Sequence, residues 1–246
     1  MASRPKGEAK PAASDPRGKI VDALMELAAE RRFEDITIRD ICHSAGVSLA
    51  EFRDFFPSKG AVIAGFSRRI DRAVLEQDTG ELADESPRER LFDILMRRFE
   101  AMAPYREGVH EAVAWLQRDP AAALAMNQVV MNSMRFMLEA AGIDAEGPAG
   151  MIKLQGLAIA WARLIRVWLD DKEPELSKTM AELDRTLTHG ERAVAGVDRI
   201  SAFAAPFTAL ARAVVEARRR PSRERGRGSS RKSEGKSEEG DDAVAL

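Results

Sequence analysis

The chain has 246 residues, of which 45% are hydrophobic, and this length and composition allow one or two domains with a buried core and exclude disorder throughout. Its 38 Lys and Arg residues face 40 Asp and Glu residues, so any binding to nucleic acid must come from a local patch. The single cysteine, Cys42, excludes an intramolecular disulfide, and no apolar run reaches the ~20 residues that a membrane-spanning helix needs. Because the N-terminus also shows no apolar run typical of a signal sequence, we expect a cytoplasmic protein.

The chain is predicted to begin with a flexible basic arm. Residues 1–14 are small, polar and interrupted by proline, a composition that favours disorder. From Ile20 the apolar residues recur at helical spacing, which predicts a first helix that runs to about Arg32.

Two short capped helices are predicted next. Thr37 and Ser48 are each followed three residues later by an acid, which is the spacing of a capping box. The first helix is expected to end at Gly46 and the second before Pro57. Three aromatic residues are expected on the buried side of the second helix: Phe52, Phe55 and Phe56.

The rest of the folded chain is also predicted to be helical, because its apolar residues keep a spacing of three to four and no run alternates as a half-buried strand would. The predicted helices cover 58–77, 86–102, 105–118, 120–141, 149–169, 174–187 and 197–220. We therefore expect an all-α protein, with one unit over residues 15–77, a larger helical domain over 85–220 and a disordered charged tail over 221–246.

The two short helices and the turn between them form a pattern typical of a helix-turn-helix, although the same pattern occurs in many helical bundles. The segment TIRDICHSAGVSLAEFRDFFPSKGAVI closely resembles the N-terminal domain of the TetR family of bacterial transcriptional regulators. The resemblance spans about residues 17–70 and implies a TetR-like fold in which the second short helix enters the major groove of DNA. Residues 31–72 hold eight basic and six acidic residues, so the electrostatic attraction to phosphates is weak.

The resemblance also implies which residues touch double-stranded DNA. Thr37 and Lys59 would hold phosphates at the two ends of the motif. The remaining candidate DNA contacts lie on or next to the second short helix: Ser48, Leu49, Ala50, Glu51 and Arg53. Glu51, Arg53 and Phe55 depart from the residues that the family usually has. A carboxylate can still accept a hydrogen bond from cytosine and an arginine can bind guanine, so the departures do not forbid base reading.

The C-terminal half shows a second resemblance. Trp161 to Asp171, followed by Pro174 to Arg185, looks like the signature region of the ubiquinone-biosynthesis lipid-binding family, over about residues 85–215. This resemblance implies an apolar pocket and a terminal amphipathic helix that contacts a membrane. The membrane face would consist of Ile200, Phe203, Phe207, Leu210 and Val214. The same stripe is typical of a helix that packs on its own core or across a dimer.

A pocket for a small apolar ligand or lipid is expected among the methionine and aromatic residues of the larger domain. The candidate lining residues are Met96, Phe99, Trp115, Met126, Met134 and Trp161, although such residues are more often ordinary core. The three histidines show no zinc-type spacing, so no metal and no cofactor is predicted. Neither a glycine-rich phosphate loop nor a nucleophile elbow indicates an enzyme.

Two functions agree with these patterns. The first is a ligand-responsive TetR-type transcriptional regulator, a homodimer that binds a DNA operator and dimerises through the helix of Trp168 and the helix over 176–187. The second is a lipid-binding accessory protein of ubiquinone biosynthesis, with peripheral membrane contact and no DNA binding.

Overall fold

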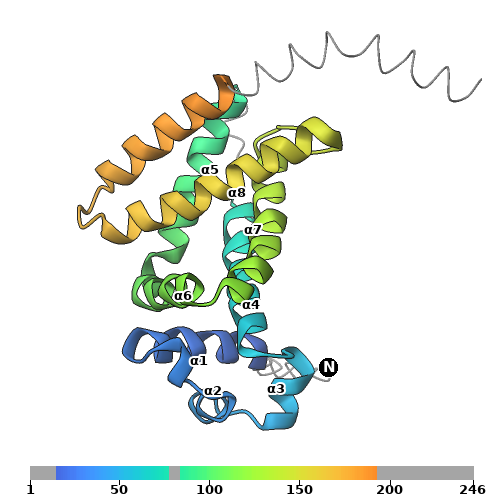
Figure 1. The fold of residues 1–246 in the computed structure, drawn as a ribbon, viewed down its shortest axis with the longest axis vertical. Helices are drawn as coiled ribbons and strands as arrows, with labels where there is room; N and C mark the ends of the chain where they lie inside the picture. The colour runs from blue at the N-terminus through green and yellow to red at the C-terminus, as the bar shows by residue number, and fades with distance from the viewer. Residues whose placement is uncertain (1–14, 78–83, 193–246) are drawn as a thin grey trace, which may run out of the picture. The chain divides into compact units, whose positions relative to one another are not determined.

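The computed structural model describes residues 15–77 and 84–192 (Figure 1). Every regular element in these two ranges is a helix, so the predicted all-α class is confirmed. The arm predicted at 1–14, the helix predicted at 197–220 with its membrane face, and the tail predicted at 221–246 lie outside the described residues.

The N-terminal helices occur in the predicted order. They are α1 (Pro16–Glu30), the 3-10 helix η1 (Phe33–Asp35), α2 (Ile38–Ala45), α3 (Leu49–Phe55) and α4 (Lys59–Leu75). Helix α1 begins four residues before the first buried apolar residue, because Pro16 at its first turn already has the backbone angle of a helix. The residues between Pro16 and Ile20 are only partly covered, so hydrophobic spacing gives no signal there.

The following helices also lie close to their predicted ranges. They are α5 (Pro87–Met102), η3 (Ala103–Tyr105), α6 (Arg106–Arg118), α7 (Pro120–Ala140), α8 (Gly147–Asp170) and a helix over 177–192. The last of these starts later than predicted. Its beginning is set by the buried Asp171, whose carboxylate accepts hydrogen bonds from the backbone N–H and the hydroxyl of Thr179 at 2.9 and 2.8 Å.

Both predicted caps of the helix-turn-helix are present. In α2 the Thr37 hydroxyl accepts from the Asp40 N–H, and the Asp40 carboxylate accepts from the Thr37 N–H. Ser48 and Glu51 form the same reciprocal pair at α3. Between the two helices Gly46 has a φ of 65°, which ends α2 in the left-handed conformation that glycine accepts without strain.

The expectation that Phe55 is buried was wrong. Phe52 and Phe56 are 2% and 1% exposed, whereas Phe55 is 40% exposed. Helix α3 ends at Phe55, and Phe56 adopts an extended conformation that turns its ring back into the core. The end of the helix therefore places two neighbouring aromatic side chains in different environments.

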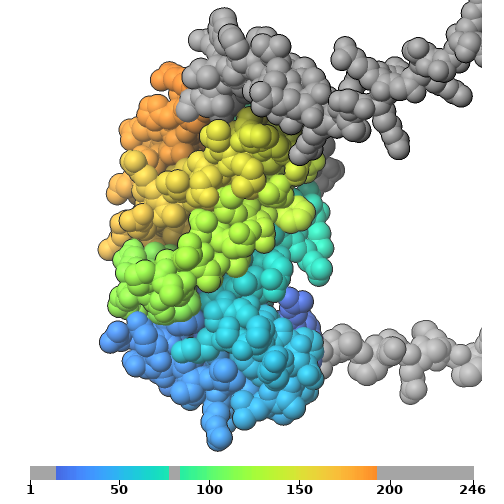
Figure 2. Space-filling model, turned by 45° about the vertical axis from the view of Figure 1, so that its right-hand side comes forward, coloured from blue at the N-terminus to red at the C-terminus, as the bar shows by residue number. Residues whose placement is uncertain are grey.

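The helix-turn-helix unit is joined to the larger domain by direct packing of α1 against α6, seen in Figure 1 and in the space-filling view of Figure 2. Gly108 of α6 makes this approach possible, because a Cβ at that position would lie 2.5 Å from the backbone oxygen of Met25. Phe33 of η1 stacks on Trp115 of α6, with ring centroids 4.1 Å apart. The contact between the two parts is therefore close and apolar at its centre.

A charged cluster closes the edge of this junction. The Arg118 guanidinium binds both oxygens of Glu34, at 2.7 and 3.1 Å, and also binds Glu111 at 2.6 Å. Glu111 accepts a further hydrogen bond from the backbone N–H of Phe33 at 2.9 Å. The hydrogen bond from Arg118 is the main reason that the pKa of Glu34 falls from 4.5 to about 2.

Helix α4 is held in the larger domain by a buried polar network. Arg98 of α5 forms an ion pair with Asp71 of α4, and Asp71 also accepts a hydrogen bond from Ser133 of α7. Arg98 donates to Ser67 of α4 at 3.2 Å, and its guanidinium lies 5.1 Å from the centre of the Trp161 ring of α8. Burial lowers the pKa of Arg98. The network therefore connects α4 with three other helices.

We expect Arg98→Met to reduce the free energy of unfolding by about 3–5 kcal/mol, because it leaves the Asp71 carboxylate buried without its partner. Urea unfolding followed by circular dichroism measures this loss. The double variant Arg98→Met, Asp71→Leu should recover much of it. Arg72→Met, which removes an exposed pair with Glu76, is the control and should change little. A double variant as unstable as the single one would contradict this account.

We expect the stability contributed by Glu34 to depend on pH. A carboxylate with a lowered pKa stabilises the folded protein fully above its ordinary value of 4.5, and this contribution is lost as the pH falls toward 2. Glu34→Gln should therefore be less stable than the wild type at pH 7, and the difference should shrink between pH 4.5 and pH 2. Urea unfolding across this range tests it, with the exposed neighbour Asp35→Asn as the control. A difference that does not change with pH would be inconsistent with the ion pair as its cause.

Candidate functional site

Helix α3 presents most of its surface to solvent, as a recognition helix must. It is anchored by the buried Phe52, while the other side chains of the helix are exposed. Leu49 is 50% exposed, and Ala50 and Arg53 lie on the same open side. The α3 residues that the resemblance implies touch DNA are therefore accessible.

Glu51, one of the two acids of α3, has a local structural role. One oxygen of Glu51 accepts hydrogen bonds from the backbone N–H and the hydroxyl of Ser48, both at 2.8 Å. These two bonds hold the pKa of Glu51 below its usual range, the backbone bond more strongly. Contact of the Glu51 carboxylate with a base remains a prediction. Such a contact would have to use Oε1, because Oε2 accepts both hydrogen bonds from Ser48.

The groups expected to hold phosphates already have partners within the protein. The N–H and hydroxyl of Thr37 both donate to Asp40 at 2.8 Å. The ammonium of Lys59 donates to the backbone oxygens of Phe33 and Ile36 and lies 4.9 Å from the centre of the Phe33 ring. Burial is the main cause that lowers the pKa of Lys59. Since an ammonium has three donors, Lys59 keeps one for a phosphate, and its main role in the structure is to hold η1 against α4.

Two arginines of the helix-turn-helix unit remain available to a partner outside the protein. Arg39 on α2 and Arg53 on α3 are exposed, and neither has an ion pair or a side-chain hydrogen bond within the described residues. Arg39 was not among the DNA contacts predicted from the sequence. Arg39 is the second residue of α2, two positions after the N-cap Thr37, and its place on the solvent side becomes visible only once the buried side of α2 is known.

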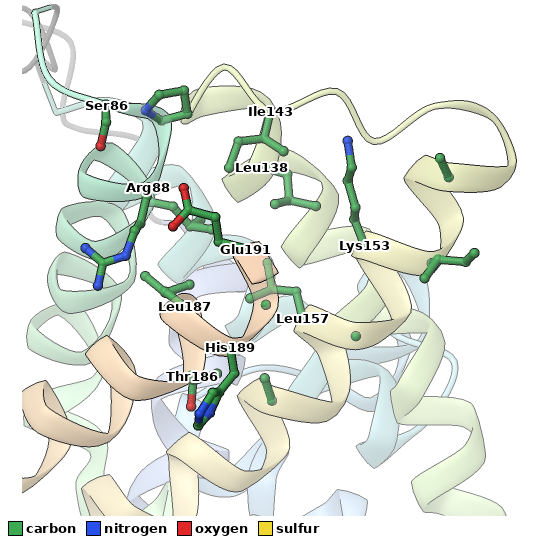
Figure 3. A pocket seen from close by; sticks show the side chains of 17 residues that line it. Ser86, Arg88, Leu138, Ile143, Lys153, Leu157, Thr186, Leu187, His189 and Glu191 are labelled. Atoms are coloured by element: carbon green, nitrogen blue, oxygen red, sulfur yellow. The ribbon is translucent and has the colours of Figure 1, made fainter. Parts of the chain in front are cut away.

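A cavity of about 590 Å³ opens in the larger domain between α5, the end of α7, α8 and the helix over 177–192 (Figure 3). Its apolar lining includes Leu91, Leu138, Ile143, Ile152, Leu157 and Leu187. Polar and charged side chains border it: Ser86, Arg88, Lys153, Thr186, His189 and Glu191. An apolar cavity of this size with a few polar groups is typical of a small-molecule site.

None of the six residues predicted to line a ligand pocket borders this cavity. Phe99, Met134 and Trp161 are buried in the core, where Phe99 stacks on Trp161 with ring centroids 4.8 Å apart. Met96 is partly buried against the same core. Trp115 and Met126 line a second hollow, at the junction of η1, α4, α6 and α7. Large apolar side chains fill space, so they mark the core better than they mark a cavity.

The signal that could have located the cavity is a row of small residues on α8. Ala149, Gly156 and Ala160 recur at helical spacing and all line the cavity, with Lys153 on the same face. Within the described residues no helix is long and apolar enough to cross a membrane, and no cluster of three potential metal ligands occurs.

No protein-family model matches the chain. Over 102 residues it is 32% identical to the HTH-type transcriptional regulator BetI of Brucella anthropi, a match that covers 41% of this chain and 50% of the relative. The chain thus spans about half the length of this curated relative.

Solved structures match a larger part of the chain. A TetR transcriptional regulator from Nitrosomonas europaea superposes with a TM-score of 0.57 at 23% identity, covering 71% of this chain and 97% of that one. FadR of Thermus thermophilus, a TetR family transcriptional repressor in complex with lauroyl-CoA, gives a TM-score of 0.51 at 22% identity, covering 71% and 92%. None of these three relatives is a ubiquinone-biosynthesis protein, so they give no support to that resemblance. The described residues have the fold of TetR-type transcriptional regulators.

Proposed function

We propose that the protein is a ligand-responsive transcriptional regulator of TetR type, which binds a double-stranded DNA operator as a homodimer. The observation that carries this proposal is an exposed, capped α3 in a unit joined by α4 to a domain with an apolar cavity. The BetI relative matches the chain at 32% identity, and the FadR relative was solved with lauroyl-CoA. The first supports a transcriptional regulator, and the second supports a response to a small molecule.

The packing suggests how a ligand would act on DNA binding. The cavity is bordered by α5 and α8, and the Arg98 side chain of α5 binds Asp71 of α4 and lies over Trp161 of α8. Helix α4 begins directly after α3. A ligand that favours another position of α5 or α8 would therefore displace α4 and change the separation of the two α3 helices in a dimer. Such a change weakens binding when the two half-sites are at a fixed distance.

The dimer interface is predicted on the helix of Trp168, which is α8, and on the helix over 176–187. Trp168 and Leu183 themselves are fully buried within one protomer, so a contact on these two helices would use other side chains. Large apolar side chains are instead exposed on α7 and α8: Leu124, Phe136, Met151, Ile152 and Ile159. Ile159 is 65% exposed, and helices α7 and α8 are the surfaces on which we place the contact between protomers.

We expect Arg53→Ala to weaken binding to the operator by about 1–3 kcal/mol and to relax base preference. Glu51→Gln should instead strengthen binding to all sequences alike, because it removes a negative charge facing phosphates while an amide oxygen can still accept from Ser48. Mobility shifts at two salt concentrations, with DNA from upstream of the protein's own gene, measure both effects. Glu26→Gln on α1 is the matched control for charge. Wild-type protein that binds all sequences equally would refute the regulator function.

We expect Ile159→Asp to shift the protein from dimer to monomer, because the new carboxylate would lose its water in an apolar contact. Sedimentation velocity at micromolar protein measures the change. Gln117→Asp, at an exposed position of α6, introduces the same charge and should remain dimeric. If Ile159→Asp stays dimeric as well, the interface does not include this part of α8.

A further inference from the structure

We propose that the ligand of the 590 Å³ cavity is an amphiphile with one apolar chain and a single negatively charged head group, which Lys153 binds. This inference rests on the proposed function, because it names the chemistry to which the regulator responds. Three features of the cavity carry it: its apolar walls, the open space beside Gly156, and the charges at its border.

The walls suit a hydrocarbon chain. Leu91, Leu138 and Leu157 are 4%, 3% and 8% exposed, and all three border the cavity. Figure 3 shows Leu138, Ile143 and Leu157 between Lys153 on the α8 side and Arg88 on the α5 side. An apolar chain placed against these walls would be removed from water, which is favourable in proportion to the area covered.

Space for the chain is kept open by a glycine in the middle of α8. Among residues 15–77 and 84–192, a Cβ built on Gly156 would meet no atom within 4 Å, so no side chain or backbone in these ranges requires glycine there. Glycine in the interior of a helix is less favourable than alanine. The residue is thus unfavourable for the helix and unnecessary for packing within the described residues, and its effect is to enlarge the cavity.

The charged side chains at the border of the cavity favour a negatively charged head group on the ligand. Arg88 is already engaged, since its guanidinium binds the Asp184 carboxylate at 2.5 Å and the Thr188 hydroxyl at 3.1 Å. Lys153 is half-buried and has no hydrogen bond or ion pair within the described residues. Glu191 and His189 are exposed, and Glu191 lies on the Arg88 side in Figure 3. An anionic head group would give the Lys153 ammonium the partner that it lacks.

One unpaired cation suits one negative charge. A head group with several charges, such as a nucleotide, would leave most of them without a partner at this border, which is unfavourable in an apolar site. We therefore assign the head group to a free carboxylate rather than to an acyl chain carried by coenzyme A.

Isothermal titration calorimetry with the full chain tests the assignment, using decanoate, 1-decanol, decyltrimethylammonium and decanoyl-coenzyme A as probes of equal chain length. Decanoate should bind about tenfold to a hundredfold more tightly than 1-decanol. Lys153→Met should weaken decanoate binding by the same factor and leave 1-decanol unchanged. Gly156→Leu should weaken both by at least about tenfold, because its side chain would occupy the space of the hydrocarbon.

Matched variants show whether these effects are local. Lys172→Met removes an ammonium that does not border the cavity, and Ala103→Leu adds the same bulk at an exposed position of η3, away from the cavity and from α8; both should bind decanoate as the wild type does. Tighter binding of decyltrimethylammonium or decanoyl-coenzyme A, equal binding of decanoate by Lys153→Met, or no binding of any probe would overturn the proposal. Because these titrations contain no DNA, their outcome is independent of whether the mobility shift finds an operator.

Discussion

The buried ion pair between Asp71 and Arg98 is the interaction on which the arrangement of the two parts depends. Helix α4 carries the helix-turn-helix unit at its start and buries Asp71 farther along, where Asp71 binds Arg98 of α5 and Ser133 of α7. A charge inside a protein is stable only with its partner, so α4 cannot turn or slide against α5 without a large loss. Apolar contacts alone would tolerate small shifts. The ion pair therefore ties the position of α4 to that of α5. Because α3 precedes α4 in the chain, the position of α3 also depends on the larger domain.

The acids of the helix-turn-helix have a second consequence besides capping. Helices α2 and α3 have 8 and 7 residues, lengths at which a helix is unstable without tertiary contacts and caps. Asp40 and Glu51 complete the caps and also suit the positive end of each helix dipole. The same carboxylates repel phosphates, so they lower affinity for any DNA. A regulator gains selectivity when binding to nonspecific sites is weak, because those sites vastly outnumber the operator.

The sequence predicted the features that depend on neighbours along the chain. Both caps, the Gly46 turn and the order of the helices follow from residues three or four positions apart. It failed where partners come from distant segments. The exposure of Phe55, the engagement of Lys59 by the carbonyls of η1, and the start of the last described helix at residue 177 all depend on tertiary contacts. The cavity was missed for a related reason, since it is marked by side chains that are small rather than by large apolar ones.

Helix α8 has one face that packs in the core and another face that borders the cavity. One of its faces is fixed by Trp161 and Trp168, which stack on Phe99 of α5 with ring centroids 4.8 and 5.7 Å away. The other face borders the cavity with Gly156 and Lys153. In a helix of 24 residues, packing on the first face contributes far more stability than the propensity of one glycine removes. Under the proposed function, substitutions on the cavity face would alter the size and charge of the ligand without disturbing the helix. The aromatic face would keep its connection to α4, because Arg98 lies over Trp161 and pairs with Asp71.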